Sequence, residues 1–87
     1  MKKVVMFTQT TCGPCKQLKP HLKAATDQLN MQLEEVNVQD DWDLAVKNGV
    51  KSTPTVVVVE DDKQLTTVGA RTTLALIKEL EPYAEQS

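Results

Sequence analysis

The feature that most constrains this chain is the stretch Thr10-Thr11-Cys12-Gly13-Pro14-Cys15-Lys16, which holds both of its cysteines. A short apolar run, Val4-Val5-Met6-Phe7, precedes this stretch. Apolar residues with helical spacing follow it, namely Leu18, Leu22, Ala25 and Leu29. The cysteine pair is therefore predicted to lie where a strand ends and a helix begins. The first turn of a helix carries unpaired N–H groups and partial positive charge, so it lowers the pKa of a thiol and favours a nucleophilic thiolate.

Length and composition predict one small domain over residues 1–87. The 87 residues, 40% of them apolar, are enough for one hydrophobic core. The net charge of −2 and the three aromatic residues (one Phe, one Trp, one Tyr) offer little to a polyanion or to stacked bases, so nucleic-acid binding is not predicted. No apolar run is long enough for a membrane span or a signal peptide. We expect a cytoplasmic protein; the alternative is that a leader has been removed.

The hydrophobic patterns predict an α/β fold. Short apolar or β-branched runs indicate strands at residues 2–8, 32–38, 55–60 and 64–68. Helices are indicated at residues 15–29, at about 41–48 and from Thr72 or Thr73 to about Ala84. The order is thus β-α-β-α-β-β-α, and a right-handed helical crossover makes the first two strands parallel. We expect a four-stranded mixed sheet flanked by three helices on both faces, with the valine-rich strand 55–60 in its interior.

Local signals also predict where elements end and which side chains are buried. Asn30 and Gly49 mark helix ends, Asp61-Asp62-Lys63 marks a turn, and residues 85–87 should fray. In the last helix the residues expected to face the core are Leu74, Ile77, Leu80 and Ala84. Trp42, at the start of the middle helix, is expected to pack on the edge of the core.

The spacing of the cysteines favours a redox pair over a structural staple or a metal site. A disulfide that closes so short a loop stabilises a fold by only roughly 2 kcal/mol in the chain-entropy model. A zinc ion needs four ligands, and the pair supplies two. The remaining soft ligand is His21, which lies six residues past Cys15 and points away from the pair. We therefore predict no metal.

The motif and the element order together resemble the thioredoxin family over nearly the whole chain. Cys12-Gly13-Pro14-Cys15-Lys16 matches the active site of that family. Residues 49–55, Gly-Val-Lys-Ser-Thr-Pro-Thr, resemble its Gly-Ile-Arg-Gly-Ile-Pro-Thr segment, and Val68-Gly69-Ala70 matches its glycine turn before the last helix. The resemblance implies the thioredoxin fold, although the strand and helix that precede the motif in full-length thioredoxins are missing here.

The resemblance implies a small dithiol–disulfide oxidoreductase that reduces protein disulfides. Cys12 would be the nucleophile that forms a mixed disulfide with the target, and Cys15 would resolve it. Gly13 and Pro14 would hold the turn, and the rigid proline would favour the reducing direction. Lys16, Lys19 and Lys23 share one face of the predicted helix. They would either dock an acidic partner and add to the field that favours a Cys12 thiolate, or form a solvated face, which is the interpretation favoured for Lys19 and Lys23.

The chain departs from the family pattern around the cysteines. Thr11 stands where the family usually has Trp, and it either donates a hydrogen bond to the Cys12 thiolate or merely fills the loop. Met6 occupies the position of a buried Asp, and Glu35 that of a nearby Lys, two groups thought to help move the proton of the second cysteine. Glu35 is either the replacement proton acceptor for Cys15 or a solvated strand residue.

Three residues are candidates for binding the substrate. The resemblance implies a cis peptide bond between Thr53 and Pro54, beside the cysteines, which would leave the Thr53 backbone free to pair with an extended peptide. The alternative is an ordinary trans proline that starts a strand. Gly69 is expected to permit either close approach of the substrate or a turn with positive φ.

The source of electrons remains open between two partners, with no bound cofactor expected. An NADPH-dependent flavoprotein thioredoxin reductase is favoured by the Gly-Pro pair and by the lack of a Gly-Gly-x-x-Asp glutathione signature before the last helix. Glutathione, as in glutaredoxins, is favoured by the compact size and by Thr11. A third alternative is a binding module that uses the fold without turnover. We expect a monomer that meets disulfide-containing proteins.

Overall fold

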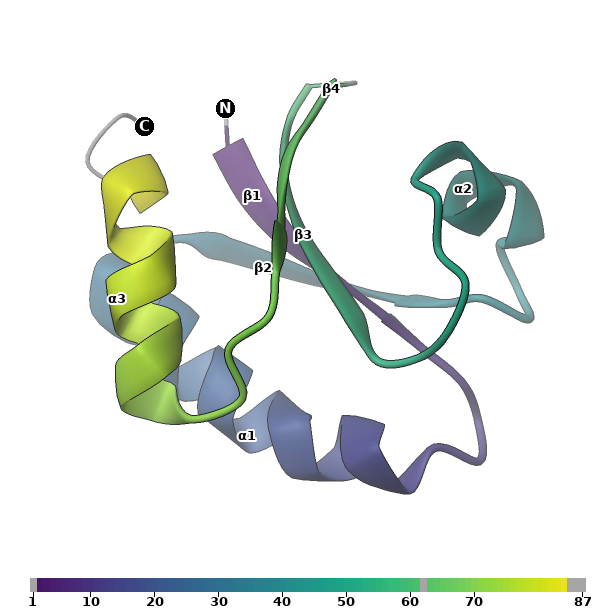
Figure 1. Ribbon diagram of the computed structural model, residues 1–87, viewed down its shortest axis with the longest axis horizontal. Coiled ribbons are helices and arrows are strands. Elements are labelled where there is room, and N and C mark those ends of the chain that lie inside the picture. Colours follow the sequence, from purple (N-terminus) through teal and green to yellow (C-terminus); the bar gives the residue numbers. More distant parts are fainter. Residues whose placement is uncertain (1, 62, 85–87) are drawn as a thin grey trace.

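The computed structural model describes residues 2–61 and 63–84 of the chain. Its elements follow the predicted order: β1 (Lys2–Thr8), α1 (Gly13–Leu29), β2 (Gln32–Asn37), α2 (Trp42–Lys47), β3 (Thr55–Glu60), β4 (Lys63–Val68) and α3 (Thr73–Ala84) (Figure 1). α1 begins two residues earlier than predicted. Asp62, assigned to a turn, and residues 85–87, expected to fray, lie outside the described residues.

The four strands form one mixed sheet in the order β2-β1-β3-β4. β1 and β2 are parallel because α1 connects them, whereas β3 is antiparallel to both β1 and β4. The register places Met6 between Glu35 of β2 and Val56 of β3. The predicted mixed sheet is confirmed. The valine-rich β3 lies in its interior, between β1 and β4, and its valines are buried on both faces of the sheet.

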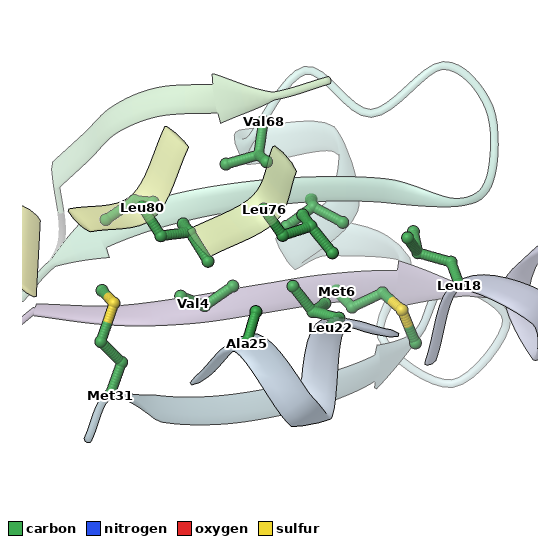
Figure 2. Packing of buried hydrophobic residues seen from close by; sticks show 11 residues of the cluster. Val4, Met6, Leu18, Leu22, Ala25, Met31, Val68, Leu76 and Leu80 are labelled. Carbon is green, nitrogen blue, oxygen red and sulfur yellow. The ribbon is translucent and has the colours of Figure 1, made fainter. Parts of the chain in front are cut away.

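Each face of the sheet carries its own hydrophobic cluster, because successive side chains of a strand point to opposite faces. Val4, Met6 and Val56 face α1 and α3, where the largest partners are Leu22, Leu76 and Leu80 (Figure 2). Val5, Phe7 and Val57 face the other way and pack with Ala45 of α2. Figure 1 accordingly shows α2 on the side of the sheet opposite α1 and α3.

Two sequence predictions about buried side chains are wrong. Leu74 is 74% exposed, and Leu76, two residues later, is fully buried. Two residues on a helix lie about 200° apart, so the face that holds Leu76 and Leu80 against the sheet turns Leu74 outward. Trp42 is 67% exposed and lies on the surface of α2, not within the core edge.

The predicted helix ends are confirmed. Asn30 caps α1 with φ of 58°, and Gly49 follows α2 with φ of 70°, the left-handed region that asparagine and glycine adopt most easily. Thr72 precedes α3 and caps it, because its Oγ1 accepts a hydrogen bond from the Ala75 N–H at 3.4 Å. Among the helices of the described residues, none has the length and apolar character needed to cross a membrane.

Candidate active site

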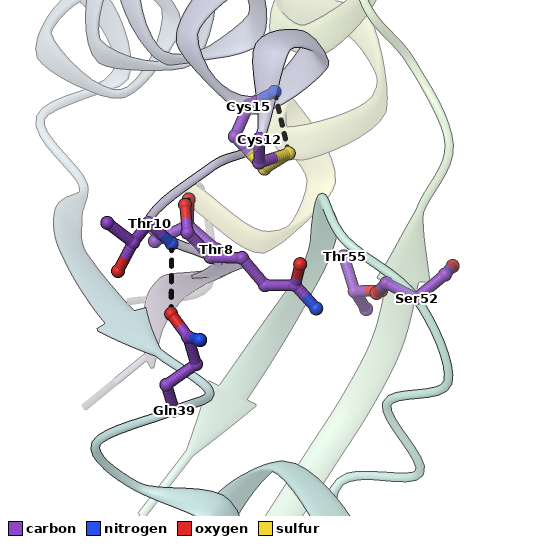
Figure 3. Close-up of a disulfide and its surroundings, with 8 residues drawn as sticks. Thr8, Thr10, Cys12, Cys15, Gln39, Ser52 and Thr55 are labelled. Carbon is purple, nitrogen blue, oxygen red and sulfur yellow. Dashed lines mark hydrogen bonds between the residues drawn. A yellow bond between two sulfur atoms is a disulfide. The ribbon is translucent and has the colours of Figure 1, made fainter.

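Cys12 and Cys15 form a disulfide at the beginning of α1, with Cα atoms 5.3 Å apart. Cys12 is the N-cap residue, and its Sγ accepts a hydrogen bond of 3.2 Å from the Cys15 N–H (Figure 3). Both cysteines are buried in this oxidised form, Cys12 slightly less (6% against 3% exposed). A helix amide directed at the Cys12 sulfur would equally stabilise a thiolate there, as the sequence predicts.

The loop between β1 and α1 is fastened to the end of β2 by side chains that the sequence analysis did not single out. The Thr10 N–H donates to Gln39 Oε1 at 3.3 Å (Figure 3), and Asn37 Nδ2 donates to Thr10 Oγ1 at 3.2 Å. The Gln39 N–H in turn donates to Asn37 Oδ1 at 2.9 Å. These bonds fix the segment that leads into Cys12. No motif marks the two bonds to Thr10, because each joins residues nearly thirty positions apart.

A cavity of about 290 Å³ opens beside the disulfide. Both cysteines line it, and so do Lys16, Lys19 and Glu35. Lys19 Nζ forms an ion pair of 3.3 Å with Glu35 Oε2. The structure therefore brings Glu35, a predicted supporting residue, to the same cavity as the cysteines, together with a lysine that the sequence suggested was merely solvated.

Glu35 and Met6 are neighbours in the sheet. They are paired in the parallel register of β1 and β2, so their side chains lie on the same face, toward α1. Met6 is only 1% exposed and belongs to the core, whereas the Glu35 side chain is 42% exposed. The Glu35 carboxylate therefore lies on β2, at the edge of the cavity, one strand away from the buried Met6 position on β1.

The remaining supporting residues surround the disulfide at the surface. Gly13 and Pro14 form the first turn of α1, and Pro14 lies at a position where its missing N–H costs no helical hydrogen bond. Thr11 and Lys16 are exposed on either side of Cys12.

The Thr53–Pro54 peptide bond is cis, the geometry that the resemblance implies. Pro54 is buried and Thr53 is half-buried. Both border an open hollow of about 460 Å³ together with Pro14, Gln17, Leu18, His21 and Arg71. Among the described residues, the Thr53 backbone has no hydrogen-bond partner. Its N–H and C=O are therefore available to an external peptide.

His21 belongs to the contact between two helices. Its Nδ1 lies 2.8 Å from Thr73 Oγ1, at the start of α3. Within residues 2–61 and 63–84, no group of three or more His, Cys, Asp or Glu side chains is arranged to hold a metal ion.

Gly69 is held in place by a residue that no sequence motif indicates. The Gly69 and Ala70 N–H groups each donate a hydrogen bond of 3.1 Å to one carboxylate oxygen of Glu79, from α3. Gly69 does not have a positive φ, so that alternative is wrong. A Cβ atom at Gly69 would meet nothing within 4 Å, so the space outside it is open to an approaching chain.

The comparisons with known proteins agree on one family. The family model described as Thioredoxin matches residues 1–82. Thioredoxin-2, mitochondrial, of Schizosaccharomyces pombe is 36% identical over 84 residues, which are 94% of this chain and 62% of that protein. A thioredoxin of Mycoplasma genitalium is 39% identical over 59 residues, 67% of this chain and 58% of that protein.

A longer relative is NADPH-dependent thioredoxin reductase 3 of Arabidopsis thaliana. It is 33% identical over 67 residues, which are 75% of this chain but 13% of that protein. The chain therefore spans less than two thirds of the length of these three relatives.

Solved structures show the same fold. An oxidised thioredoxin from Plasmodium falciparum matches with a TM-score of 0.80 and 26% identity, covering 95% of this chain and 81% of that one. A mutant thioredoxin from Halobacterium salinarum matches with a TM-score of 0.84 and 27% identity, covering 95% and 74%. The sheet order and its three helices are thus those of the thioredoxin fold, as predicted.

Proposed function

This chain belongs to the thioredoxin family, and from that premise we propose that it is a dithiol–disulfide oxidoreductase that reduces protein disulfides. The observation that carries the proposal is the Cys12–Cys15 disulfide at the start of α1, with a helix amide bonded to the Cys12 sulfur. The binding-module alternative is not favoured, because both cysteines are present and close enough to bond.

The proposed reaction begins from the reduced pair. The Cys12 thiolate attacks one sulfur of the target disulfide, the target S–S bond breaks, and the first target thiolate leaves. Cys15 then loses its proton and attacks Cys12 Sγ, which breaks the mixed disulfide and releases the second target thiolate. Two electrons pass to the target, and the Cys12–Cys15 disulfide of the described structure is the product.

The target segment is proposed to lie along Thr53. The free N–H and C=O of this residue offer the two hydrogen bonds that an added strand uses. Gly69 faces open space and has no side chain, so it would allow the target segment to pass close to its backbone. Such pairing holds a target sulfur near Cys12 without dependence on the target's side chains.

We propose that electrons come from NADPH through a flavoprotein thioredoxin reductase. The similarity of this chain to part of a protein named NADPH-dependent thioredoxin reductase supports this source. The test is to supply the oxidised chain either with such a reductase and NADPH or with glutathione, glutathione reductase and NADPH, and to follow NADPH oxidation. Faster turnover with the thioredoxin reductase is expected. Turnover with glutathione alone would overturn this part of the proposal. The cytoplasmic location and the monomeric state expected from the sequence remain predictions.

Glu35 is proposed to accept the Cys15 proton, directly or through water in the shared cavity. Replacing it in Glu35→Gln keeps the size and removes the proton acceptor, so resolution of the mixed disulfide should slow by about tenfold or more. The measurement is the rate of insulin reduction as a function of pH, with the largest loss at the acidic end, where few Cys15 thiolates exist.

Glu34→Gln is the matched control for this experiment. Glu34 is the adjacent acid of β2, pairs with Lys3 at 3.3 Å and borders a hollow that contains neither cysteine. Its replacement should leave the pH profile unchanged. If Glu35→Gln also leaves the profile unchanged, Glu35 is a solvated strand residue and has no part in proton transfer.

A further inference from the structure

Two large apolar side chains on α2 are left in water. Trp42 is 67% exposed and Val46 is 57% exposed. They are four residues apart on a helix, so they lie on the same side of it and together form an apolar surface, the α2 patch. Tryptophan is enriched among the residues that contribute most to binding at protein interfaces, so its exposure here makes the patch a candidate contact surface.

Trp42, one of the two residues of the α2 patch, lines a small hollow of about 80 Å³. The hollow has an apolar floor of Val38, Ala45 and Val50, and Trp42 lines its side. Lys51 is the charged residue among those that line it within the described part of the chain. An apolar side chain therefore fits this hollow better than a charged one, because burying an unpaired charge costs far more than burying a hydrocarbon.

The hollow shares lining residues with the two openings around the disulfide and Pro54. Gln9 lines both this hollow and the cavity that contains Cys12 and Cys15. Thr53 lines both this hollow and the one beside Pro54. Gln9 and Thr53 thus lie between the disulfide and Trp42, so a polypeptide bonded to Cys12 that runs along either residue would bring its neighbouring side chains toward the hollow.

We propose that the α2 hollow binds an apolar side chain of the polypeptide segment that flanks the substrate's disulfide, with Trp42 as the main contact. This inference rests on the proposed function and adds a preference among its substrates. The cysteine loop 9–16 has no aromatic residue, so Trp42 supplies the aromatic contact next to this site. Disulfides with an apolar residue nearby are reduced faster than small disulfides, which cannot reach α2.

Trp42 is the sole tryptophan of the chain, so its fluorescence reports the proposed contact directly. The protein used is the Cys15→Ser variant, in which a mixed disulfide at Cys12 cannot be resolved. The probes are ten-residue peptides without tryptophan, each with one cysteine activated as the 2-nitro-5-thiobenzoate disulfide. The Cys12 thiolate displaces one thiobenzoate anion and forms one Cys12–peptide bond. Peptides carry Leu at one of the two to five positions on either side of the cysteine, and matched peptides carry Ser there.

The expected result is a blue shift of Trp42 emission for one or more Leu peptides and none for the Ser peptides or for bound glutathione. In steady state, wild-type protein should show a KM about threefold to tenfold lower for that Leu peptide than for its Ser partner, the range expected when one aliphatic side chain is partly buried. Trp42→Ala should abolish this ratio, and Val46→Ala should reduce it.

Leu74→Ala is the matched control, because Leu74 is an equally exposed apolar side chain, on α3, that lines neither hollow. It should leave the ratio intact. Unchanged emission for every peptide, with the mixed disulfide confirmed by mass, would overturn the α2 site and leave the proposed function standing. A blue shift with a second copy of this chain but with no peptide would also overturn it. Failure of any mixed disulfide to form would instead overturn the proposed function.

Discussion

Cys12→Ser is expected to lower the rate of protein disulfide reduction by at least about 10³-fold, because a serine hydroxyl does not form the anion that attacks a disulfide. The fold should be unaffected. The Cys12–Cys15 bond closes a very short loop, so its loss removes only roughly 2 kcal/mol of stability in the chain-entropy model. The measurement is insulin reduction with dithiothreitol as electron donor, alongside circular dichroism to confirm that the protein is folded.

Cys15→Ser should fail at a different step. Cys12 can still attack, so this variant should accumulate a covalent complex with its target, visible as a band that disappears on addition of excess dithiothreitol. Cys12→Ser should give no such band. If instead Cys15→Ser reduces insulin at the wild-type rate, or if Cys12→Ser traps the target, the assignment of nucleophile and resolving cysteine is wrong.

The position of the cysteine pair and the order of the elements could be predicted, because both follow from patterns among residues close in sequence. The cysteine pair follows an apolar strand and precedes a helical pattern, so strand-to-helix placement puts the pair at the helix start. The structure adds that Cys12 is the N-cap residue, whose sulfur accepts the Cys15 N–H. Gly49 could be assigned as a helix end because few residues adopt its φ of 70°. These features depend on residues close in sequence, which is why the sequence reveals them.

Features that depend on the register of distant segments were not predictable. The Lys19–Glu35 ion pair joins α1 to β2, and the Glu79 carboxylate reaches back ten residues to Gly69. Each requires two elements to be placed before the contact exists. Trp42 shows the same limit: its position at a helix start was evident from the sequence, but the 67% exposure of its side chain was not.

α3 shows how a correct element can still have the wrong buried face. Leu74, Ile77 and Leu80 are three residues apart and Leu76 and Leu80 are four apart, so both sets satisfy helical spacing. The first set is the one predicted from the sequence to face the core. In the structure the face with Leu76 and Leu80 packs on α1 and the sheet, and Ile77 packs against the edge of the same cluster. Only the angle at which α3 meets its neighbours decides between the sets.

Leu76→Ala is therefore expected to be among the most destabilising single substitutions in α3. Leu76 is fully buried in the cluster with Leu22 and Leu80, so its truncation removes buried hydrocarbon and leaves a cavity, at a cost of about 2–5 kcal/mol. A domain of this size has a free energy of unfolding of about 5–15 kcal/mol, so a large share would be lost. The midpoint of thermal unfolding should fall by roughly 10–20 °C.

Leu74→Ala provides the matched comparison, because the same change is made two residues away at a side chain that is 74% exposed. Its effect on the free energy of unfolding should be within about 0.5 kcal/mol, and alanine's helix propensity offsets part of any loss. Urea unfolding of both variants, followed by circular dichroism at 222 nm, measures the difference. Equal losses for the two variants, or a larger loss for Leu74→Ala, would mean that α3 packs through the face first expected from the sequence. The hydrogen bonds from Gly69 and Ala70 to Glu79 would then also be misplaced, because they depend on the same rotation of the helix.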